Sequence, residues 1–436
     1  MNIAIAGTGY VGLVTGVCLA EKGNKVICVD INYPKIKMMQ EGKTPIYEKE
    51  LEELMKKNKQ NIEYTTNYKY AYKNSDIIII GVETPEKKNG SADLTAVFNV
   101  CKEIAESIES DTIVIIKSTV PIGTSDKVEK YLNDNVERKI KVDVVSNPEF
   151  LAQGTAVRDT LYASRIVIGT ENDKVKEKMK ELYKCFNSKL VFTDRKSAEM
   201  IKYASNDFLA LKISYINEIA NLCEKTGANI EDVSHGMGLD SRIGNKFLKA
   251  GIGYGGSCFP KDTKALHWLA NTHDYELKTI KAAIEVNENQ KIKLIEKARK
   301  YYDSFEGLNI AVLGLTFKPE TDDIREAPSL VNIPILIKEN ANIKAWDPIG
   351  VDNFKRIYPN KIKYCNTIED TIKDTDICFI FTEWEEIKEY SINKYTELMK
   401  KPIIIDGRNC YNLSDCENIL LVYDSIGRKC IKNIKI

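Results

Sequence analysis

The chain opens with MNIAIAGTGYVGLVTGVCLAEKGNKVICVD (Met1–Asp30), and this stretch decides the fold of its first part. A short apolar run reads as a buried strand. Gly7, Gly9 and Gly12 follow it and open an apolar helix, after which a second strand ends at Asp30. Strand, glycine turn, helix and acidic strand end form the fingerprint of a dinucleotide-binding βαβ unit. Asp30 lies where a carboxylate reaches the ribose hydroxyls and repels a 2′-phosphate, so the sequence predicts NAD rather than NADP.

The rest of the first half alternates short β-branched runs with polar segments of helical character. That alternation is typical of a doubly wound parallel sheet, in which ligands bind at the carboxyl ends of the strands. We therefore expect functional residues directly after these runs, among them Thr84, Thr119 and Glu149.

From about Ser197 to about Lys225, apolar residues recur at helical spacing without proline or glycine. A helix of about 28 residues spans roughly 42 Å, and it predicts a connection between two domains. Lys202 and Asn206 lie four residues apart and so share one face of this helix. One interpretation of the pair is a solvated polar stripe. The alternative is a buried functional pair, because the neighbouring residues are apolar.

A second glycine-rich stretch, GIGYGGSCFPKD (Gly251–Asp262), places one cysteine between a loop and a lysine. Backbone amides and a nearby cation stabilise a thiolate, so we expect a lowered pKa for Cys258. Asp262 adds a carboxylate four residues later. An inert cysteine beside a tight turn is the alternative interpretation. The coincidence of nucleophile, carboxylate and glycine loop favours covalent catalysis.

The last part of the chain repeats the first. NIAVLG (Asn309–Gly314) echoes NIAIAG (Asn2–Gly7), but the later glycines of the turn do not recur, so we expect a second sheet of the same type without close dinucleotide approach. Lys318 and Arg325 follow the strand end and are candidates for a phosphorylated ligand, with isolated surface cations as the alternative. The predicted domains are an NAD-binding Rossmann domain (1–196), a central helical domain with the cysteine loop (197–304) and a Rossmann-like domain (305–436).

Composition narrows the classes of function. Lys and Arg number 63 and Asp and Glu number 63, so the chain has no overall attraction to nucleic acid. No apolar run is long enough to span a membrane, and the opening strand leaves no room for a signal peptide. The 11 cysteines include no C-x-x-C pair, and the 3 histidines do not cluster with them. This pattern disfavours a structural metal and favours a reducing cytoplasm.

Taken together, these features resemble the UDP-glucose 6-dehydrogenase family essentially from end to end. The motifs that carry the resemblance are GTGYVG (Gly7–Gly12), STVPIGT (Ser118–Thr124), NPEFL (Asn147–Leu151), EMIKYASN (Glu199–Asn206), FLKAGIGYGGSCFPKD (Phe247–Asp262) and GLTFKPETDDIREAPS (Gly314–Ser329). The run FLKAGIGYGG resembles the UDP-glucose branch more than the branches acting on GDP-mannose or UDP-N-acetylmannosamine. Another class of function, a non-catalytic sensor of NAD and a sugar nucleotide, is disfavoured because binding alone needs no nucleophile.

The resemblance implies a four-electron, NAD-dependent oxidation of UDP-glucose to UDP-glucuronate through a thiohemiacetal and a thioester on Cys258. The other catalytic residues it implies are Lys202, Asn206, Asp262, Glu149 and Thr119. The cofactor contacts it implies are Gly7, Gly9, Tyr10, Val11, Gly12, Asp30, Lys35, Thr84, Thr119, Glu149, Lys261 and Arg325. The substrate contacts it implies are Glu149, Phe150, Leu151, Gln153, Lys202, Asn206, Arg242, Phe247, Leu248, Lys249, Ala250, Gly251, Gly255, Lys318 and Arg408. It also implies that the Rossmann-like domain at 305–436 binds the UDP-sugar, and that the chain forms a homodimer in which Arg242 reaches the neighbouring subunit.

One position departs from the family pattern. Many relatives carry a second glutamate four residues after the first, and here that position is Gln153. A glutamine side chain forms hydrogen bonds but takes up no proton at neutral pH. Glu149 is therefore the stronger candidate for activating water.

Overall fold

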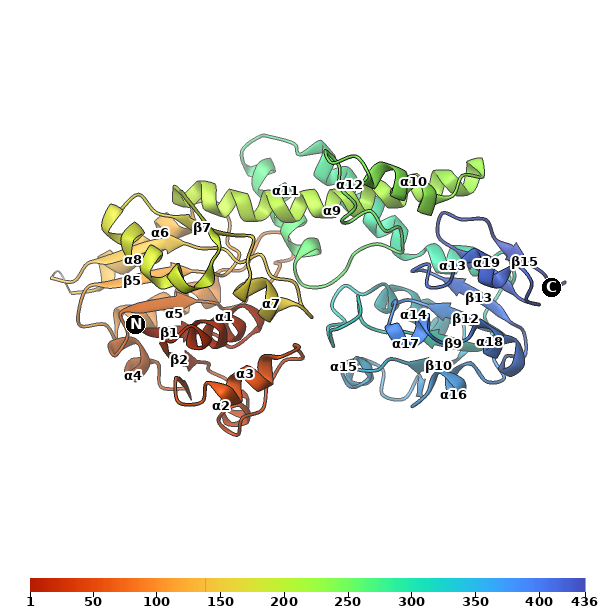
Figure 1. Ribbon diagram of the computed structural model, residues 1–436, viewed down its shortest axis with the longest axis horizontal. Helices are drawn as coiled ribbons and strands as arrows, with labels where there is room; N and C mark the ends of the chain where they lie inside the picture. The colour runs from red at the N-terminus through yellow and green to blue at the C-terminus, as the bar shows by residue number, and fades with distance from the viewer. Residues whose placement is uncertain (138, 436) are drawn as a thin grey trace. The chain divides into compact units, whose positions relative to one another are not determined.

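The structure is a computed structural model that describes residues 1–137 and 139–435. The chain divides into two compact units (Figure 1). The first unit comprises Met1–Ser205 and Trp268–His273, and the second comprises Asn206–His267 and Asp274–Ile436. Each unit is built around one sheet.

An eight-stranded sheet lies at the centre of the first unit, in the order β3-β2-β1-β4-β5-β6-β7-β8. Its strands are β1 (Asn2–Ala6), β2 (Lys25–Val29), β3 (Ile62–Thr65), β4 (Ile77–Ile80), β5 (Thr112–Ile116), β6 (Val142–Ser146), β7 (Arg165–Gly169) and β8 (Lys189–Thr193). Alternate residues of β4 belong to two different apolar clusters, so both faces of the sheet are covered. The strand order reverses beside β1, as in a doubly wound fold. The predicted fold class is confirmed.

Helices follow most strands of this sheet. They are α1 (Tyr10–Glu21), α2 (Tyr33–Gln40), α3 (Leu51–Lys57), α4 (Tyr68–Lys73), α5 (Thr95–Ala105), α6 (Thr124–Asn135), α7 (Ala156–Leu161), α8 (Asp173–Tyr183) and the 3₁₀ turn η1 (Lys184–Phe186). One local departure from a fully parallel sheet occurs at β7, which pairs antiparallel with β6. The segment between these strands holds only the short α7, so it supplies no full helical crossover of the kind that parallel neighbours need.

The long helix expected after about Ser197 is α9 (Arg195–Thr226), which has 32 residues. It is followed by α10 (Ile230–Gly238), α11 (Phe259–Thr272), α12 (Lys278–Lys291) and α13 (Lys293–Ala298). Within the described part of the chain, none of the helices combines the length and apolar character needed to cross a membrane.

A seven-stranded sheet forms the second unit, in the order β11-β10-β9-β12-β13-β14-β15. Its strands are β9 (Asn309–Leu313), β10 (Asn342–Trp346), β11 (Lys363–Tyr364), β12 (Ile377–Ile380), β13 (Ile403–Asp406), β14 (Val422–Ser425) and β15 (Ile431–Lys432), and only β15 pairs antiparallel within this described sheet. The accompanying helices are α14 (Pro328–Lys338), α15 (Val351–Ile357), α16 (Ile368–Ile372), α17 (Glu385–Lys388), α18 (Ile392–Leu398) and α19 (Leu413–Cys416). The order beside β9 reproduces the order beside β1, as the sequence repeat predicts.

Candidate functional site

The glycine loop after β1 has the geometry that a dinucleotide pyrophosphate requires. Gly7 adopts a positive φ of 93°, and a Cβ at Gly12 would lie 2.0 Å from the carbonyl oxygen of Gly7, so no larger residue fits there. A Cβ at Gly9 would meet no atom within 4 Å, which leaves open space where a ligand would approach. The first turn of α1 is not capped by a side chain. The N-terminus of this helix therefore suits an anion.

Asp30 lies at the carboxyl end of β2, beside this loop. Its Oδ2 accepts hydrogen bonds from the backbone N–H and hydroxyl of Thr8, at 2.9 and 2.6 Å, and its Oδ1 accepts one from the Asn32 N–H. A carboxylate held in this way presents negative charge next to the loop. The arrangement fits a ribose with two hydroxyls and repels a 2′-phosphate.

The other expected cofactor contacts of the first unit surround the strand ends. The Thr84 hydroxyl donates to the carbonyl oxygen of Thr119 at 2.8 Å, which joins the segments after β4 and β5. Tyr10 donates its hydroxyl to the Tyr47 carbonyl, and Val11 lies in the first turn of α1. Lys35 lies in the first turn of α2, with its backbone N–H donated to Asn32.

The second sheet shows why a repeated fold need not repeat the ligand. Asp347, the counterpart of Asp30, is buried, and its Oδ2 accepts from the Leu315 N–H and the Trp384 indole N–H. Its Oδ1 accepts from the Ile349 and Gly350 N–H groups. Protein donors contact both oxygens of Asp30 as well, so the two carboxylates differ in burial: Asp347 is 4% exposed, whereas Asp30 is half-buried. A buried carboxylate of this kind has no open surface on which to receive a ribose, and its hydrogen bonds hold the backbone after β9 and β10.

A buried ion pair joins Glu149 to α9. The Lys202 Nζ lies 2.9 Å from the Glu149 Oε1, and the two side chains are only 3% and 6% exposed. The Leu151 N–H donates to the other oxygen of Glu149, and the Phe150 ring centroid lies 5.5 Å from the Lys202 Nζ. Lys202 is therefore not part of a solvated stripe. Gln153, the position that departs from the family, lies two residues beyond Leu151.

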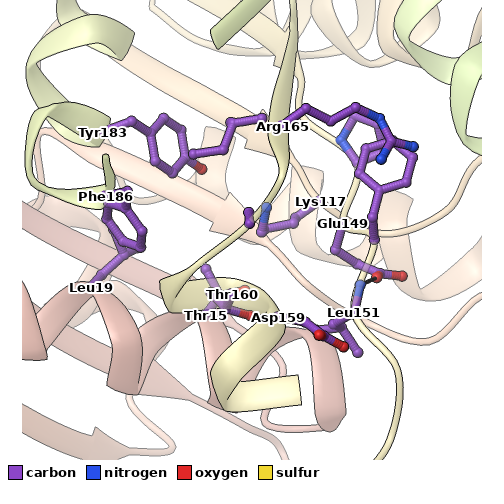
Figure 2. Close-up of a pocket in the computed structure, with 14 residues that line it drawn as sticks. Thr15, Leu19, Lys117, Glu149, Leu151, Asp159, Thr160, Arg165, Tyr183 and Phe186 are labelled. Carbon is purple, nitrogen blue, oxygen red and sulfur yellow. Dashed lines mark hydrogen bonds between the residues drawn. The ribbon is translucent and has the colours of Figure 1, made fainter. Parts of the chain in front are cut away.

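Glu149 also lines a pocket, together with Leu151 and Lys117 (Figure 2). Burial lowers the pKa of Lys117 to about 8. The Lys117 ammonium donates to the side-chain oxygen of Asn147 at 3.2 Å. Sequence reasoning passed over Lys117 because a lysine at a strand end gives no sign of its burial.

In the second unit, Asp262 lies in the first turn of α11 and is fully buried. Its Oδ2 accepts from the Asn206 side-chain amide at 2.7 Å, and its Oδ1 accepts from the Lys261 ammonium at 2.6 Å. The structure thus brings together Asn206, Asp262 and Lys261, all of which the sequence singled out.

Cys258 directly precedes α11. Its carbonyl oxygen accepts the Asp262 N–H at 2.8 Å, as the residue at a helix N-cap does, and its side chain is exposed. The Ser257 hydroxyl lies 3.8 Å from the Cys258 Sγ. Cys258 therefore lies at the positive, N-terminal end of α11, where a thiolate is stabilised.

The expected substrate residues of the second unit lie along the glycine loop and the segments packed against it. Phe247 has a positive φ of 64°, and its ring packs edge-on against Phe259. A Cβ at Gly255 would lie 2.4 Å from the Glu326 carbonyl oxygen, so only glycine fits. Leu248 is buried, whereas the flanking Lys249 is exposed and Ala250 is half-buried.

The arginines expected at this site differ in their surroundings. Arg408 donates to the carbonyl oxygens of Gly253 and Phe317, both at 3.2 Å. Arg325 forms a forked pair with Asp323, and Arg242 forms one with Asp240, so both planar guanidinium groups are held in fixed orientations. The Lys318 ammonium lies 5.7 Å from the Phe317 ring centroid.

Asp207, which follows Asn206 on α9, is a buried carboxyl group that sequence reasoning missed. Neither of its oxygens has a hydrogen-bond partner among the described residues. Burial, with a smaller contribution from the negative charge of Asp262, raises the pKa of Asp207 to about 8. The spacing of apolar residues along α9 does not distinguish a buried aspartate at position 207 from an exposed one.

Replacing Asp207 by asparagine is expected to stabilise the protein at pH 8 but not at pH 4. Because the pKa rises from an ordinary 3.8 to about 8, the folded chain keeps a proton between these values that the unfolded chain releases. Stability of the wild type therefore falls as the pH rises through this window. We expect the melting temperature of Asp207→Asn to exceed that of the wild type by about 3 °C or more at pH 8. An equal difference at both pH values would contradict this assignment.

No group of three or more potential metal ligands occurs among residues 1–137 and 139–435.

Sequence reasoning also missed the partner of Glu199, at the start of the EMIKYASN motif. Glu199 is buried, and its Oε1 accepts from the N–H and hydroxyl of Ser125 at 2.8 and 2.6 Å. It anchors the first turn of α9 to the first turn of α6.

Comparison with known proteins places this geometry in a family. Three models of the UDP-glucose/GDP-mannose dehydrogenase family match the chain, namely the NAD binding domain over residues 1–187, the central domain over 196–289 and the UDP binding domain over 311–413. The chain is 48% identical over 433 residues to a UDP-glucose 6-dehydrogenase of Bacillus subtilis, covering 99% of this chain and 98% of that protein. It is 42% identical to a UDP-glucose 6-dehydrogenase of Rickettsia conorii, covering 98% and 100%.

Solved structures agree with these matches. A UDP-glucose dehydrogenase from Pyrobaculum islandicum superimposes with a TM-score of 0.92 at 29% identity, covering 98% of each chain. A UDP-D-ManNAc dehydrogenase from Pyrococcus horikoshii gives a TM-score of 0.87 at 27% identity, covering 100% of each chain. The cofactor predicted from the glycine loop and Asp30 is confirmed as NAD by the match to the NAD binding domain.

Proposed function

This chain belongs to the UDP-glucose/GDP-mannose dehydrogenase family, and from that premise we propose that it oxidises UDP-glucose to UDP-glucuronate with two NAD. The high identity to the Bacillus subtilis relative over nearly the whole chain supports UDP-glucose as the substrate. The observation that carries the chemistry is the position of Cys258, exposed at the start of α11 with the fixed carboxylate of Asp262 in the same turn.

The proposed oxidation proceeds through covalent attachment to sulfur. The C6 alcohol first loses a proton and a hydride and becomes an aldehyde. The Cys258 thiolate adds to the aldehyde carbon, and the thiohemiacetal, as its oxyanion, loses a second hydride and becomes a thioester. Water then adds to the thioester carbon and the C–S bond breaks, which releases the carboxylate, restores the thiolate and gives two protons to solvent. NAD held at the Gly7–Gly12 loop beside Asp30 would supply the hydride acceptor for both oxidations.

The other polar residues have the proposed roles that the family resemblance implies. Asn206 and Asp262 hold each other, so Asp262 is oriented to accept a proton, and Thr119 helps to position the reacting oxygen. Lys202 stabilises developing negative charge on oxygen. Glu149, held by Lys202 and the Leu151 N–H, activates the water that cleaves the thioester. The remaining cofactor and substrate contacts are proposed as the family resemblance implies them.

The experiment that tests the substrate is a panel of sugar nucleotides assayed for NADH formation. We expect UDP-glucose to give the highest kcat/KM. A higher value for GDP-mannose or UDP-N-acetylmannosamine would place the chain in another branch of the family. Tight binding of UDP-glucose without any NADH formation would instead favour the sensor.

Cofactor preference should depend on Asp30. Its carboxylate accepts hydrogen bonds from ribose hydroxyls and repels a 2′-phosphate, so kcat/KM with NAD should exceed that with NADP by about tenfold or more. Asp30→Asn removes the charge at nearly constant size and should narrow this ratio. Equal efficiency of the wild-type protein with both cofactors would refute the role of Asp30.

We propose that the chain forms a homodimer through α9. Phe208, Tyr215 and Leu222 are 61%, 47% and 54% exposed and recur at intervals of seven residues, which places three large apolar side chains along one face of the helix. An apolar stripe of this kind is typical of an interface, and a second copy of the chain would cover it. Analytical ultracentrifugation should give a dimer, and Tyr215→Glu should weaken it.

A cytoplasmic location is proposed as well. None of the 11 cysteines is part of a disulfide, and several of them, such as Cys28 and Cys378, are buried in the sheets. Thiols in this number are typical of a reducing compartment.

A further inference from the structure

The glycine loop before Cys258 is held by side-chain amides that no motif of the sequence pointed to. The Gly251 N–H donates to the Asn217 Oδ1 at 2.8 Å, and the Gln290 Nε2 donates to the Gly251 carbonyl oxygen at 2.7 Å. Asn221 donates to the Gln290 Oε1 at 2.9 Å and orients that amide. Asn217 and Gln290 are fully buried. Both backbone groups of Gly251 are therefore bound by side chains from α9 and α12.

A third buried side-chain amide, that of Asn287, holds the loop at Tyr254, three residues after Gly251. The Asn287 Oδ1 accepts the Tyr254 N–H at 2.8 Å, and the Asn287 Nδ2 donates to the Tyr254 carbonyl oxygen at 3.1 Å. One side chain thus pairs with both backbone groups of one residue, as a neighbouring strand would. Gly253 makes this approach possible, because a Cβ there would lie 2.7 Å from the Asn287 Oδ1.

Asn287 is connected to the start of α11 through Tyr254. The Tyr254 ring packs edge-on against the Phe259 ring, with centroids 5.9 Å apart and planes at 90°. Phe259 is the first residue of α11 and follows Cys258 directly. Asn287 therefore orients Tyr254, and Tyr254 supports the turn that presents the thiol.

Buried amides are a costly means of joining two helices unless their hydrogen bonds are needed. An amide removed from water without compensation costs free energy, and apolar side chains pack α9 against α12 without that cost. Here Asn217, Asn287 and Gln290 each form at least one hydrogen bond with the backbone of the loop. This distribution indicates that loop geometry, rather than helix packing, determines the residue type.

We propose that Asn217, Gln290 and Asn287 form an amide clamp of positioning residues with two separate effects. The pair Asn217 and Gln290 holds Gly251, at the end of the segment expected to bind the sugar nucleotide, and so sets substrate affinity. Asn287 holds Tyr254 and so sets the reactivity of Cys258. The assignment of Asn217 and Gln290 to substrate affinity, and of Asn287 to turnover, rests on the proposed function.

The test compares Gln290→Leu and Asn287→Leu with Asn332→Leu. Asn332 is a matched control because it is a fully buried amide of the same unit that donates to the backbone carbonyl oxygens of Lys291 and Pro328, outside the loop. The measurements are the melting temperature, KM for UDP-glucose, kcat, and the rate at which iodoacetamide alkylates Cys258, read from its peptide by mass spectrometry.

Gln290→Leu should raise KM for UDP-glucose about tenfold and change kcat less than about twofold, as the loss of one buried hydrogen bond permits. Asn287→Leu should lower kcat about tenfold and slow alkylation of Cys258 severalfold, with little change in KM. Asn332→Leu should lower the melting temperature to a similar extent and leave KM, kcat and alkylation at wild-type values.

Equal effects of all three variants on every measurement, or an Asn287→Leu protein that alkylates at the wild-type rate, would overturn the clamp. If the leucine variants do not fold, Gln290→Glu and Asn287→Asp keep the size of each side chain and replace its donor, and the same split is expected. Alkylation needs no substrate, so it tests Asn287 even if UDP-glucose proves not to be oxidised. A wild-type protein that forms no NADH from UDP-glucose would refute the proposed function alone.

Discussion

Replacing Cys258 by alanine is expected to lower steady-state formation of UDP-glucuronate by at least about a thousandfold, because no other group holds the carbon between the two oxidations. NAD binding should persist, since the Gly7–Gly12 loop belongs to a different element. The variant should still interconvert alcohol and aldehyde slowly, because hydride transfer itself needs no sulfur. Isothermal titration with NAD and a coupled assay of the acid measure the two properties separately.

The number of NADH formed per UDP-glucose tests the same mechanism in the wild-type protein. Each UDP-glucose consumed should yield two NADH and one UDP-glucuronate, with little free aldehyde. Cys185→Ala is the matched control, because Cys185 is also exposed and lies far from Cys258 in the sequence. One NADH per sugar, or normal acid formation by Cys258→Ala, would refute covalent catalysis at this residue.

Breaking the buried pair between Lys202 and Glu149 should have the second largest effect. Lys202→Met removes the cation and leaves the Glu149 carboxylate buried without its ion-pair partner, so the free energy of unfolding should fall by about 3–5 kcal/mol. Turnover should fall together with stability. Urea unfolding measures the first effect, and NADH formation measures the second.

The double variant Lys202→Met/Glu149→Gln separates the two effects. It removes both charges, so most of the lost stability should return, whereas activity should not. A double variant as unstable as Lys202→Met would show that the unpaired Glu149 charge is not the cause of the lost stability.

Glu149→Gln alone should accumulate an acyl-enzyme on Cys258, visible by intact-protein mass spectrometry, because the thioester forms but water is not activated. An inactive Glu149→Gln protein without any adduct would show that Glu149 acts at an earlier step than hydrolysis of the thioester.

The fold was largely predictable because its signals are local. The turn after β1 needs glycine at Gly7 and Gly12 for backbone reasons that involve only neighbouring residues. The limits of α9 followed from apolar spacing and from the absence of proline and glycine. The antiparallel pairing of β7 with β6 was not predictable, because the residues of a strand do not indicate its direction in the sheet.

The candidate site divides in the same way. By itself, the sequence determined the dinucleotide loop, its acidic partner Asp30, the repeat of the fold and the cysteine that follows the glycine loop. These features are identified by residue type and by spacing along the chain. Only the tertiary structure decided which polar groups meet, because Lys202 and Glu149 are 53 residues apart and Gln290 and Gly251 are 39 apart. It also decided that Asp347 is buried whereas Asp30 is half-buried beside an open loop, since burial depends on packing between distant segments.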